Sequence, residues 1–341
     1  MINRPPSTRA RSWISAKLLG LAAAAALGLT LFTSSPSHAQ APTAAPAAAE
    51  AVTAAPAPEA AAAPAPAAPA VEAPKVPELT VDKGDTTWML TSSALVLFMI
   101  LPGLALFYGG LVRVKNMASM LMQVSTVGGI GIVIWALWGY SMSFTDGGGL
   151  NAYVGGLSKA FLNGVTTSTN VESFSVGVGM PELVYVVFQM TFAAITAALV
   201  LGGVAERMKF IGVVIFAVLW STFVYYPVAH MVWWWAGPLT AAQQDAAATV
   251  KSAGLIWQQG AIDFAGGTVV HINSGIAGLM GALIAGPRKG YGKESMAPHS
   301  LPLTVTGVGI LWFGWFGFNA GSNLEANGYA ALAMINTILA P

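Results

Sequence analysis

The stretch DFAGGTVVHINSGIAGLMGALIA, residues 263–285, points to the fold class because it sets one histidine inside a long apolar run. From residue 264 to 285 this run can cross about 30 Å of hydrocarbon as a helix. Comparable apolar runs occupy residues 88–110, 117–140, 182–203, 211–235 and 301–321. The sequence therefore predicts an all-α polytopic membrane protein with six complete spans, and a seventh apolar run begins near Tyr329.

The composition agrees with a membrane protein. Hydrophobic residues make up 55% of the chain and charged residues only 9%, which leaves too little polar surface for a soluble globule of 341 residues. A net charge of +1 gives no nucleic-acid signal. The absence of cysteine excludes disulfide scaffolds, thiolate metal sites and cysteine nucleophiles. We expect no metal and no cofactor.

Two N-terminal segments differ from the spans. Residues 1–39 have a basic start, an apolar run and a small-x-small end at Ser37, His38 and Ala39, which is typical of a cleaved signal peptide. The alternative, a first membrane anchor, is disfavoured because the apolar run is short. Residues 40–77 are rich in alanine and proline, so we expect a semi-extended, disordered linker. Residues 78–341 form the predicted membrane domain.

Basic residues predict the orientation. Alternate connections between spans carry seven of them on one side and two on the other. The seven are Arg113, Lys115, Arg207, Lys209, Arg288, Lys289 and Lys293; the two are Lys159 and Lys251. The positive-inside rule then makes the first set cytoplasmic, which leaves the mature N-terminus outside, as a cleaved signal peptide would.

His271 is the first candidate for function, because an ionisable group in hydrocarbon is costly and usually faces a bundle interior or a water-filled path. It shares a helical face with small residues such as Gly267, Ser274 and Gly278, which would let another helix approach closely. A histidine that bonds two helices for structure alone is the alternative. Asp263 opens the same helix, and we expect it to cap the free amides of the first turn.

Aromatic residues at helical spacing form the second set of candidates. Phe188 and Phe192 are four residues apart, as are Phe318 and Ser322. Such pairs are usually packing residues, but the predicted topology places them with Trp233 in the outer half of the membrane. A tryptophan face and a hydroxyl there suit a small cation. An interfacial aromatic belt would also explain Trp233.

Other polar residues are assigned to structure. Glu206 and Arg207 lie at the inner end of a span, where they could pair or cap. His230 and His299 fall at a membrane edge and in a connection, so we expect satisfied or solvated side chains. An intramembrane hydrolase built on Ser274 and His271 lacks a serine-elbow motif and a base from a second helix, so an enzyme is not predicted.

Several ordered motifs resemble the bacterial members of the ammonium transporter family. They are FYGGLVRVKN (107–116), AERMKF (205–210), AHMVW (229–233), DFAGGTVVHINSGIAGL (263–279), PHSLP (298–302) and GWFGFNAGS (314–322). The resemblance runs from about Trp88 to the last residue. It implies an ammonium-transporter-like helical bundle with inverted repeats. It also implies a homotrimer in a bacterial inner membrane, nitrogen uptake, and a PII-type regulatory partner on the cytoplasmic face.

The resemblance also implies roles for individual residues. Trp233 and Ser322 correspond to the external ammonium site, with Phe188 lining the same vestibule. Phe192 and Phe318 correspond to the stacked rings that gate the pore. His271 corresponds to the first of two pore histidines, and Asp263 to an aspartate that supports the recruitment site.

The family's second pore histidine and inner pore walls come from helices beyond residue 341, so we expect this chain to be truncated within the seventh helix. The predicted function is ammonium or ammonia transport: external capture, deprotonation and passage past His271. The alternatives are an ammonium sensor without net transport and a non-functional fragment. A purely structural membrane protein would tolerate replacement of His271 or Trp233 apart from a change in stability.

Overall fold

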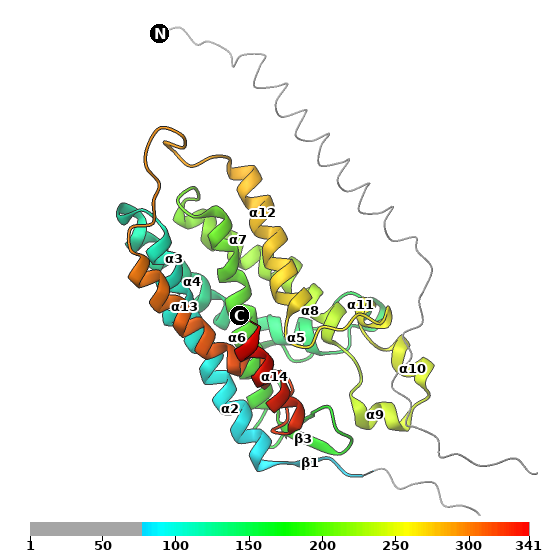
Figure 1. Ribbon diagram of the computed structural model, residues 1–341. Coiled ribbons are helices and arrows are strands. Elements are labelled where there is room, and N and C mark those ends of the chain that lie inside the picture. Colours follow the sequence, from blue (N-terminus) through cyan, green and yellow to red (C-terminus); the bar gives the residue numbers. More distant parts are fainter. Residues whose placement is uncertain (1–76, 341) are drawn as a thin grey trace, which may run out of the picture. The chain divides into compact units, whose positions relative to one another are not determined.

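Six apolar helical spans dominate the computed structural model, which describes residues 77–340 (Figure 1). The predicted signal peptide and nearly all of the predicted linker lie outside the described residues. The spans are Lys83–Leu111, Val114–Phe144, Glu182–Val204, Phe210–Trp233, Gly267–Ala285 and Leu301–Ala320. Each span begins and ends within about five residues of the corresponding predicted apolar run. The prediction of a multi-pass helical membrane protein is therefore confirmed.

Five of the six spans contain a wide π-helical turn, which in three of them joins two α-helical segments. Their helices are α2 (Lys83–Phe98), α3 (Ala105–Leu111), α4 (Met117–Ile134), α5 (Tyr140–Phe144), α6 (Glu182–Val204), α7 (Phe210–Trp220), α8 (Tyr226–Trp233), α12 (Asn273–Ala285) and α13 (Leu301–Trp315). The π turns are η1 (Met99–Leu104), η3 (Trp135–Gly139), η6 (Ser221–Tyr225), η7 (Gly267–Ile272) and η8 (Phe316–Ala320). Such turns often mark functional positions, and η7 and η8 carry His271 and Phe318.

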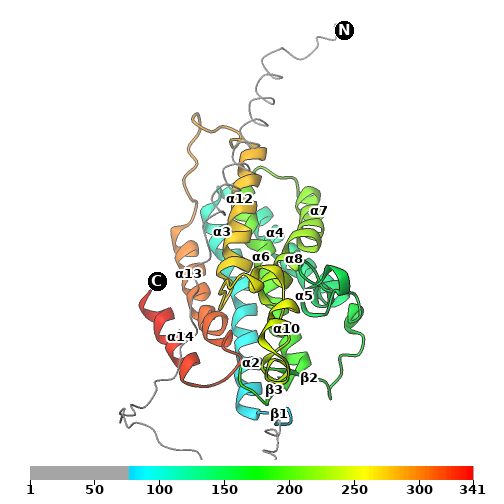
Figure 2. The ribbon, with the colours of Figure 1, turned by 90° about the vertical axis from the view of Figure 1, so that its right-hand side faces the viewer.

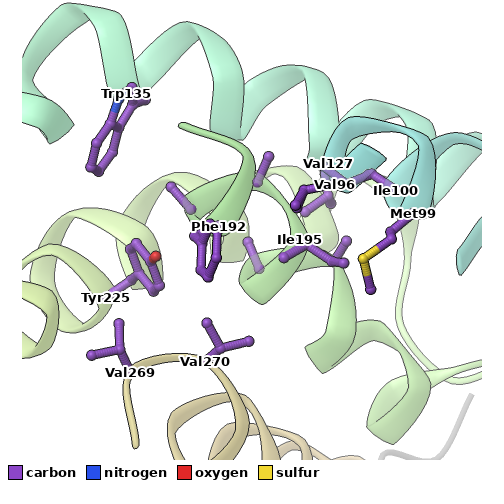
Figure 3. Packing of buried hydrophobic residues seen from close by; sticks show 14 of the residues in the cluster. Val96, Met99, Ile100, Val127, Trp135, Phe192, Ile195, Tyr225, Val269 and Val270 are labelled. Atoms are coloured by element: carbon purple, nitrogen blue, oxygen red, sulfur yellow. The ribbon is translucent and has the colours of Figure 1, made fainter. Parts of the chain in front are cut away.

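The α6 helix forms the centre of the bundle. It packs against α2, α4 and α12, and most of its residues are buried. Small residues allow close approach: a Cβ added to Gly131 on α4 would lie 2.8 Å from the Ala194 Cα, and one added to Gly203 would lie 2.4 Å from the Gly278 carbonyl oxygen. Backbone contact of this kind suits helices in lipid. Figure 3 shows Phe192 and Ile195 of α6 within this core.

The two ends of the bundle differ in charge and structure. One end, the basic face, carries the short η2 (Val114–Asn116) and the connections at 112–116, 205–209 and 286–300. These hold all seven basic residues of the predicted cytoplasmic set. The opposite end, the sheet face, carries the strands and α9 (Pro238–Gln243), α10 (Ala246–Lys251) and α11 (Leu255–Gln258), with η4 (Gly148–Leu150) and η5 (Ala160–Leu162) in the connection after α5. Figure 2 shows the strands at the lower end and the α12–α13 connection at the upper end.

A small sheet was not predicted from the sequence. The strands β1 (Thr80–Val81), β2 (Asn170–Glu172) and β3 (Val178–Pro181) form it in the order β1-β3-β2. Thr80 pairs with Val178 in parallel, whereas Val171 pairs with Met180 in an antiparallel hairpin. The sheet joins the start of α2 to the start of α6 at the sheet face.

The α14 helix (Gly328–Leu339) follows the turn at 321–327 and packs against η8. Its start agrees with the seventh apolar run predicted near Tyr329. The Asn327 side chain caps it by accepting hydrogen bonds from the amides of Tyr329 and Ala330. This cap fixes where the chain turns back after Ser322.

Candidate functional site

A cavity of about 540 Å³ at the sheet face, called the vestibule below, brings together most of the predicted site residues. Its wall includes Phe188 and Phe192 from α6, Trp233 from the end of α8, Asp263, and Ser322 from the turn after η8. These five residues come from four separate parts of the chain. The buried face of α6 and the end of α8 supply three of them, and the segments around Asp263 and Ser322 supply the other two.

Aromatic rings form the floor of the vestibule. The ring centroids of Phe188 and Phe192 are 4.9 Å apart, and the Trp233 ring meets Phe192 edge-on at 5.9 Å. Phe318 lies beneath, stacked on Phe192 with centroids 4.3 Å apart. Phe192 and Phe318 are 1% and 2% exposed. The stacked pair thus lies at the wall of the vestibule, with Phe318 on the side of Phe192 that is buried in the bundle.

His271 lies on the far side of the ring pair. Its ring centroid is 5.9 Å from that of Phe318, and it lies parallel to the Trp315 ring at 6.0 Å. Its Nδ1 is 3.0 Å from the Gly266 carbonyl oxygen, so Nδ1 donates a hydrogen there. In the neutral imidazole, Nε2 then carries the lone pair. From the wall of the vestibule the ring contacts therefore run from Phe192 to Phe318 and on to His271.

The helical face of His271 only partly matches the prediction. Gly278 and Ser274 are buried, and Gly278 packs closely on α6 through Gly203. His271 itself is exposed in the described part of the chain, and a Cβ at Gly267 would meet nothing within 4 Å. The small residues of this helix therefore pack against α6 near Gly278, whereas no such packing covers the end that carries His271.

Asp263 caps η7 as expected, with both of its carboxylate oxygens fully used. Oδ1 accepts the N–H groups of Gly266 at 2.5 Å and Gly267 at 2.9 Å, and Oδ2 accepts those of Thr268 at 2.8 Å and Val269 at 2.9 Å. Gly266, with φ +100°, provides the left-handed turn that brings these amides together. Asp263 therefore fixes the backbone at the start of η7 with four hydrogen bonds.

Hydrogen bonds orient Trp233 and Ser322. The Trp233 indole N–H donates to the Asp263 carbonyl oxygen at 3.0 Å, which ties α8 to the start of η7. The Ser322 hydroxyl donates to the Phe318 carbonyl oxygen at 2.8 Å. With its hydrogen committed, the Ser322 hydroxyl offers only acceptor lone pairs to the vestibule. A tryptophan ring and an acceptor oxygen thus lie on the wall of one cavity.

The remaining polar candidates of the sequence make structural contacts. His230 is buried, with its ring nitrogens 3.0 Å and 2.7 Å from the carbonyl oxygens of Ser143 and Asn151. His299 Nδ1 lies 3.0 Å from the Val112 carbonyl oxygen. The Ser274 hydroxyl meets the His271 backbone oxygen, not the imidazole.

The sequence allowed Glu206 to pair with its neighbour Arg207, but in the structure Glu206 has other partners. It accepts hydrogen bonds from the Arg113 backbone N–H and Nε, the Asn116 amide and Arg288 Nη1, at 2.7–3.1 Å. Burial opposes the charge, but these hydrogen bonds outweigh it and lower the Glu206 pKa to about 2. Arg207 donates instead to the carbonyl oxygens of Gly203 and Gly286. Glu206 therefore joins the three connections of the basic face.

Sequence reasoning missed three carboxylates at the sheet face. Glu182 is buried and bonds the Tyr140 hydroxyl and the Lys159 ammonium in the vestibule wall. Glu172 accepts the backbone N–H of Leu239 at the start of α9, and Glu325 accepts that of Ser175 in the turn of the β2–β3 hairpin. Each of these contacts joins segments that are distant in the sequence, so no periodic pattern signals them. In the part of the chain that the structure describes, no group of three or more histidine, aspartate or glutamate side chains could hold a metal.

Comparison with known proteins agrees with this architecture. The sequence model of the Ammonium Transporter Family matches residues 87–341. The chain is 46% identical over 263 residues to an ammonium transporter of Aquifex aeolicus, covering 77% of this chain and 56% of that protein. An ammonium transporter of Bacillus subtilis is 43% identical over 254 residues, covering 74% and 56%. The chain thus spans about half the length of the curated relatives it matches.

Solved structures resemble it too. The crystal structure of Candida albicans Mep2 has a TM-score of 0.63 and 33% identity, covering 76% of this chain and 52% of that chain. A structure described as a sensor Amt protein has a TM-score of 0.63 and 27% identity, covering 75% and 59%. With six spans of matching fold and a family match over most of its length, the chain belongs to the ammonium transporter family.

Proposed function

We propose that this chain supplies the outer vestibule, the ring gate and the first pore histidine of an ammonium transporter. The observation that supports this most is the order of groups along one path: a cavity walled by Trp233 and Ser322, then the stacked rings of Phe192 and Phe318, then His271. Ammonium meets a π face and an acceptor before the barrier, and a base after it.

Capture follows from the two polar elements of the vestibule. The Trp233 ring attracts a cation through its quadrupole. The Ser322 oxygen accepts one N–H of ammonium, because its own hydrogen is held by the Phe318 carbonyl. Phe188 adds apolar wall beside them. Asp263 keeps Trp233 in place through the indole hydrogen bond and adds negative charge nearby.

Discrimination against potassium requires more than charge, because the two cations are alike in charge and size. Ammonium donates directed hydrogen bonds and can lose a proton, whereas potassium can do neither. A dry passage between two buried rings disfavours a bare ion and admits neutral ammonia. The His271 Nε2 lone pair lies beyond the rings, where it can accept a hydrogen bond from ammonia or a proton.

The assembly proposals follow the family. They are a homotrimer in a bacterial inner membrane, the basic face in the cytoplasm with a PII-type partner, and the mature N-terminus outside. The charge asymmetry of the connections supports this orientation. The roles of the whole protein in nitrogen uptake are part of the same proposal, because the chain covers about half of its relatives.

Methylammonium uptake by the protein expressed from its complete reading frame, in cells without other ammonium transporters, tests the function. We expect saturable uptake, a loss of at least tenfold in Trp233→Leu, and a comparable loss in His271→Ala. Trp138→Leu is the matched control, because the Trp138 indole N–H bonds Thr222 away from the vestibule. Unchanged uptake in folded Trp233→Leu and His271→Ala would refute the pathway. Binding without uptake would favour a sensor.

A further inference from the structure

The β2–β3 hairpin, residues 170–181 and called the strap below, links the two walls of the vestibule. Asn170, Val171, Glu172, Ser173 and Phe174 of the strap line the same cavity as Trp233 and Ser322. A glutamate carboxylate accepts the hydrogen bonds of each of the two links. Glu172, at the end of β2, contacts the segment that leaves Trp233, and Glu325, after Ser322, contacts the strap's turn.

Glu172 holds the Trp233 side. Its Oε2 accepts the Leu239 N–H at 2.7 Å, and its Oε1 accepts the Thr240 hydroxyl at 3.3 Å. Next to this carboxylate, the backbone adopts a positive φ of +84° at Gly237. A Cβ there would lie 2.5 Å from Glu172 Oε2. A residue with a side chain would therefore displace either the carboxylate or the segment.

Glu325 holds the Ser322 side. Its Oε1 accepts the Ser173 hydroxyl at 2.7 Å and the N–H groups of Phe174 at 3.1 Å and Ser175 at 2.7 Å. Its Oε2 accepts the Ser175 hydroxyl at 2.8 Å and the Asn327 amide at 2.9 Å. Five donors thus surround a carboxylate that is only 7% exposed. Residues 173–175 of the strap all donate to this one side chain, which lies three residues after Ser322.

The turn at 321–327 has other supports that do not involve Glu325. The Ala326 N–H donates to Asp85 Oδ1 at 2.7 Å, and the Asn323 amide donates to Asn327 Oδ1 at 2.8 Å. The strap itself pairs with β1 through Val178. Loss of the Glu325 carboxylate therefore releases the strap from the turn while each part keeps its own fold.

We propose that Glu172 and Glu325 are positioning residues of the ammonium site, which together hold the Trp233 wall and the Ser322 wall at a fixed spacing through the strap. The inference rests on the proposed function and extends it to two residues that act through their hydrogen bonds to the two walls. A cation held by a ring on one wall and an oxygen on the other binds well only at one separation of the walls. Releasing either end of the strap lets that separation vary.

The test is the kinetics of methylammonium uptake by the protein expressed from its complete reading frame. Glu325→Gln and Glu172→Gln each remove the negative charge and replace one accepting oxygen by an NH2 donor, which weakens the hydrogen bonds that hold the strap, so we expect KM to rise about fivefold with Vmax within about twofold. Gly237→Ala, which disturbs the Glu172 anchor without a charge change, should reproduce the rise. The double variant should raise KM by clearly less than the product of the single effects, because a strap freed at one end no longer sets the spacing.

Glu78→Gln is the charge-matched control, since Glu78 is an exposed carboxylate at the start of the same sheet. Its KM should equal that of the parent. Unchanged KM in both anchor variants would overturn the proposal, as would a double variant whose effect equals the product of the single effects.

Hydrogen–deuterium exchange of the purified proteins gives a readout that is independent of transport. Amides of residues 173–180 should exchange faster in Glu325→Gln than in the parent or in Glu78→Gln. Equal exchange would show that Glu325 does not hold the strap. Absence of uptake by the parent would refute the proposed function, and the exchange result would still decide whether the carboxylate holds the strap.

Discussion

Phe192 and Phe318 lie on helices far apart in the sequence, yet their rings stack with centroids 4.3 Å apart and planes inclined by 26°. Both rings are almost fully buried. Neither ring carries a polar group, so the contact is dry and offers nothing to replace the water around an ion. In the proposed function, this stack is the barrier between the vestibule and His271.

Phe318→Leu should weaken this barrier. Leucine keeps most of the apolar volume but loses the ring stack, which is worth about 1 kcal/mol. We expect a slightly lower melting temperature and methylammonium uptake that becomes sensitive to external potassium. Phe313→Leu is the control, because the Phe313 side chain is 57% exposed on α13. Potassium-insensitive uptake in folded Phe318→Leu would contradict the barrier.

Asp263→Asn should destabilise the protein and reduce uptake. The amide NH2 would face two of the four backbone N–H groups that the carboxylate now accepts, at a cost of about 2 kcal/mol or more. Asp245→Asn is a matched comparison, because Asp245 caps α10 by accepting a single N–H, from Ala248. Thermal unfolding in detergent and uptake assays check both. Equal effects of the two changes would show that the four-donor cap has no special role.

Glu206 should make stability depend on pH in the acid range. Its pKa is about 2 in the folded protein and about 4.5 when unperturbed, which corresponds to about 3 kcal/mol. Because the folded pKa is the lower one, this stabilisation is present above about pH 4.5 and is lost as pH falls toward 2. Melting temperatures of the parent and Glu206→Gln, measured between pH 7 and pH 3, should therefore converge as the pH falls. A constant difference would contradict the linkage.

The contact of Gly203 with Gly278 gives a steric prediction. A Cβ at Gly203 would lie 2.4 Å from a backbone oxygen of α12, so Gly203→Ala should cost about 1–3 kcal/mol by forcing α6 and α12 apart. Gly275→Ala, on α12 with nothing within 4 Å of the new Cβ, should be neutral or stabilising by up to about 1 kcal/mol. The melting temperature should fall in Gly203→Ala and stay equal or rise in Gly275→Ala. A similar melting temperature for both would contradict the close packing.

The spans could be predicted from the sequence because hydrocarbon demands long apolar helices, and this demand is visible in any window of the chain. Helical spacing also predicted that Phe188 and Phe192 share a face, and both line the vestibule. The Asp263 cap was predictable from its place before the apolar run. In each case the signal is local or repeats with the period of the helix.

The strap and its anchors could not be predicted in this way. Glu325 meets Ser173 across 152 positions of sequence, and both lie in irregular segments. Isolated glutamates in loops are usually solvated, so Glu172 and Glu325 looked ordinary. The exposure of His271 was also unforeseen, because a helical face predicts which residues lie together and not what covers them.

The hydrogen bond from the Ser322 hydroxyl to the Phe318 carbonyl oxygen has a mechanical consequence. In the proposed function, Phe318 closes the passage with its ring and holds the acceptor hydroxyl of Ser322 with its backbone carbonyl. A rotation of η8 that swings the ring aside also displaces the Ser322 oxygen. Release of the cation by the Ser322 oxygen and opening of the ring stack are then a single concerted movement.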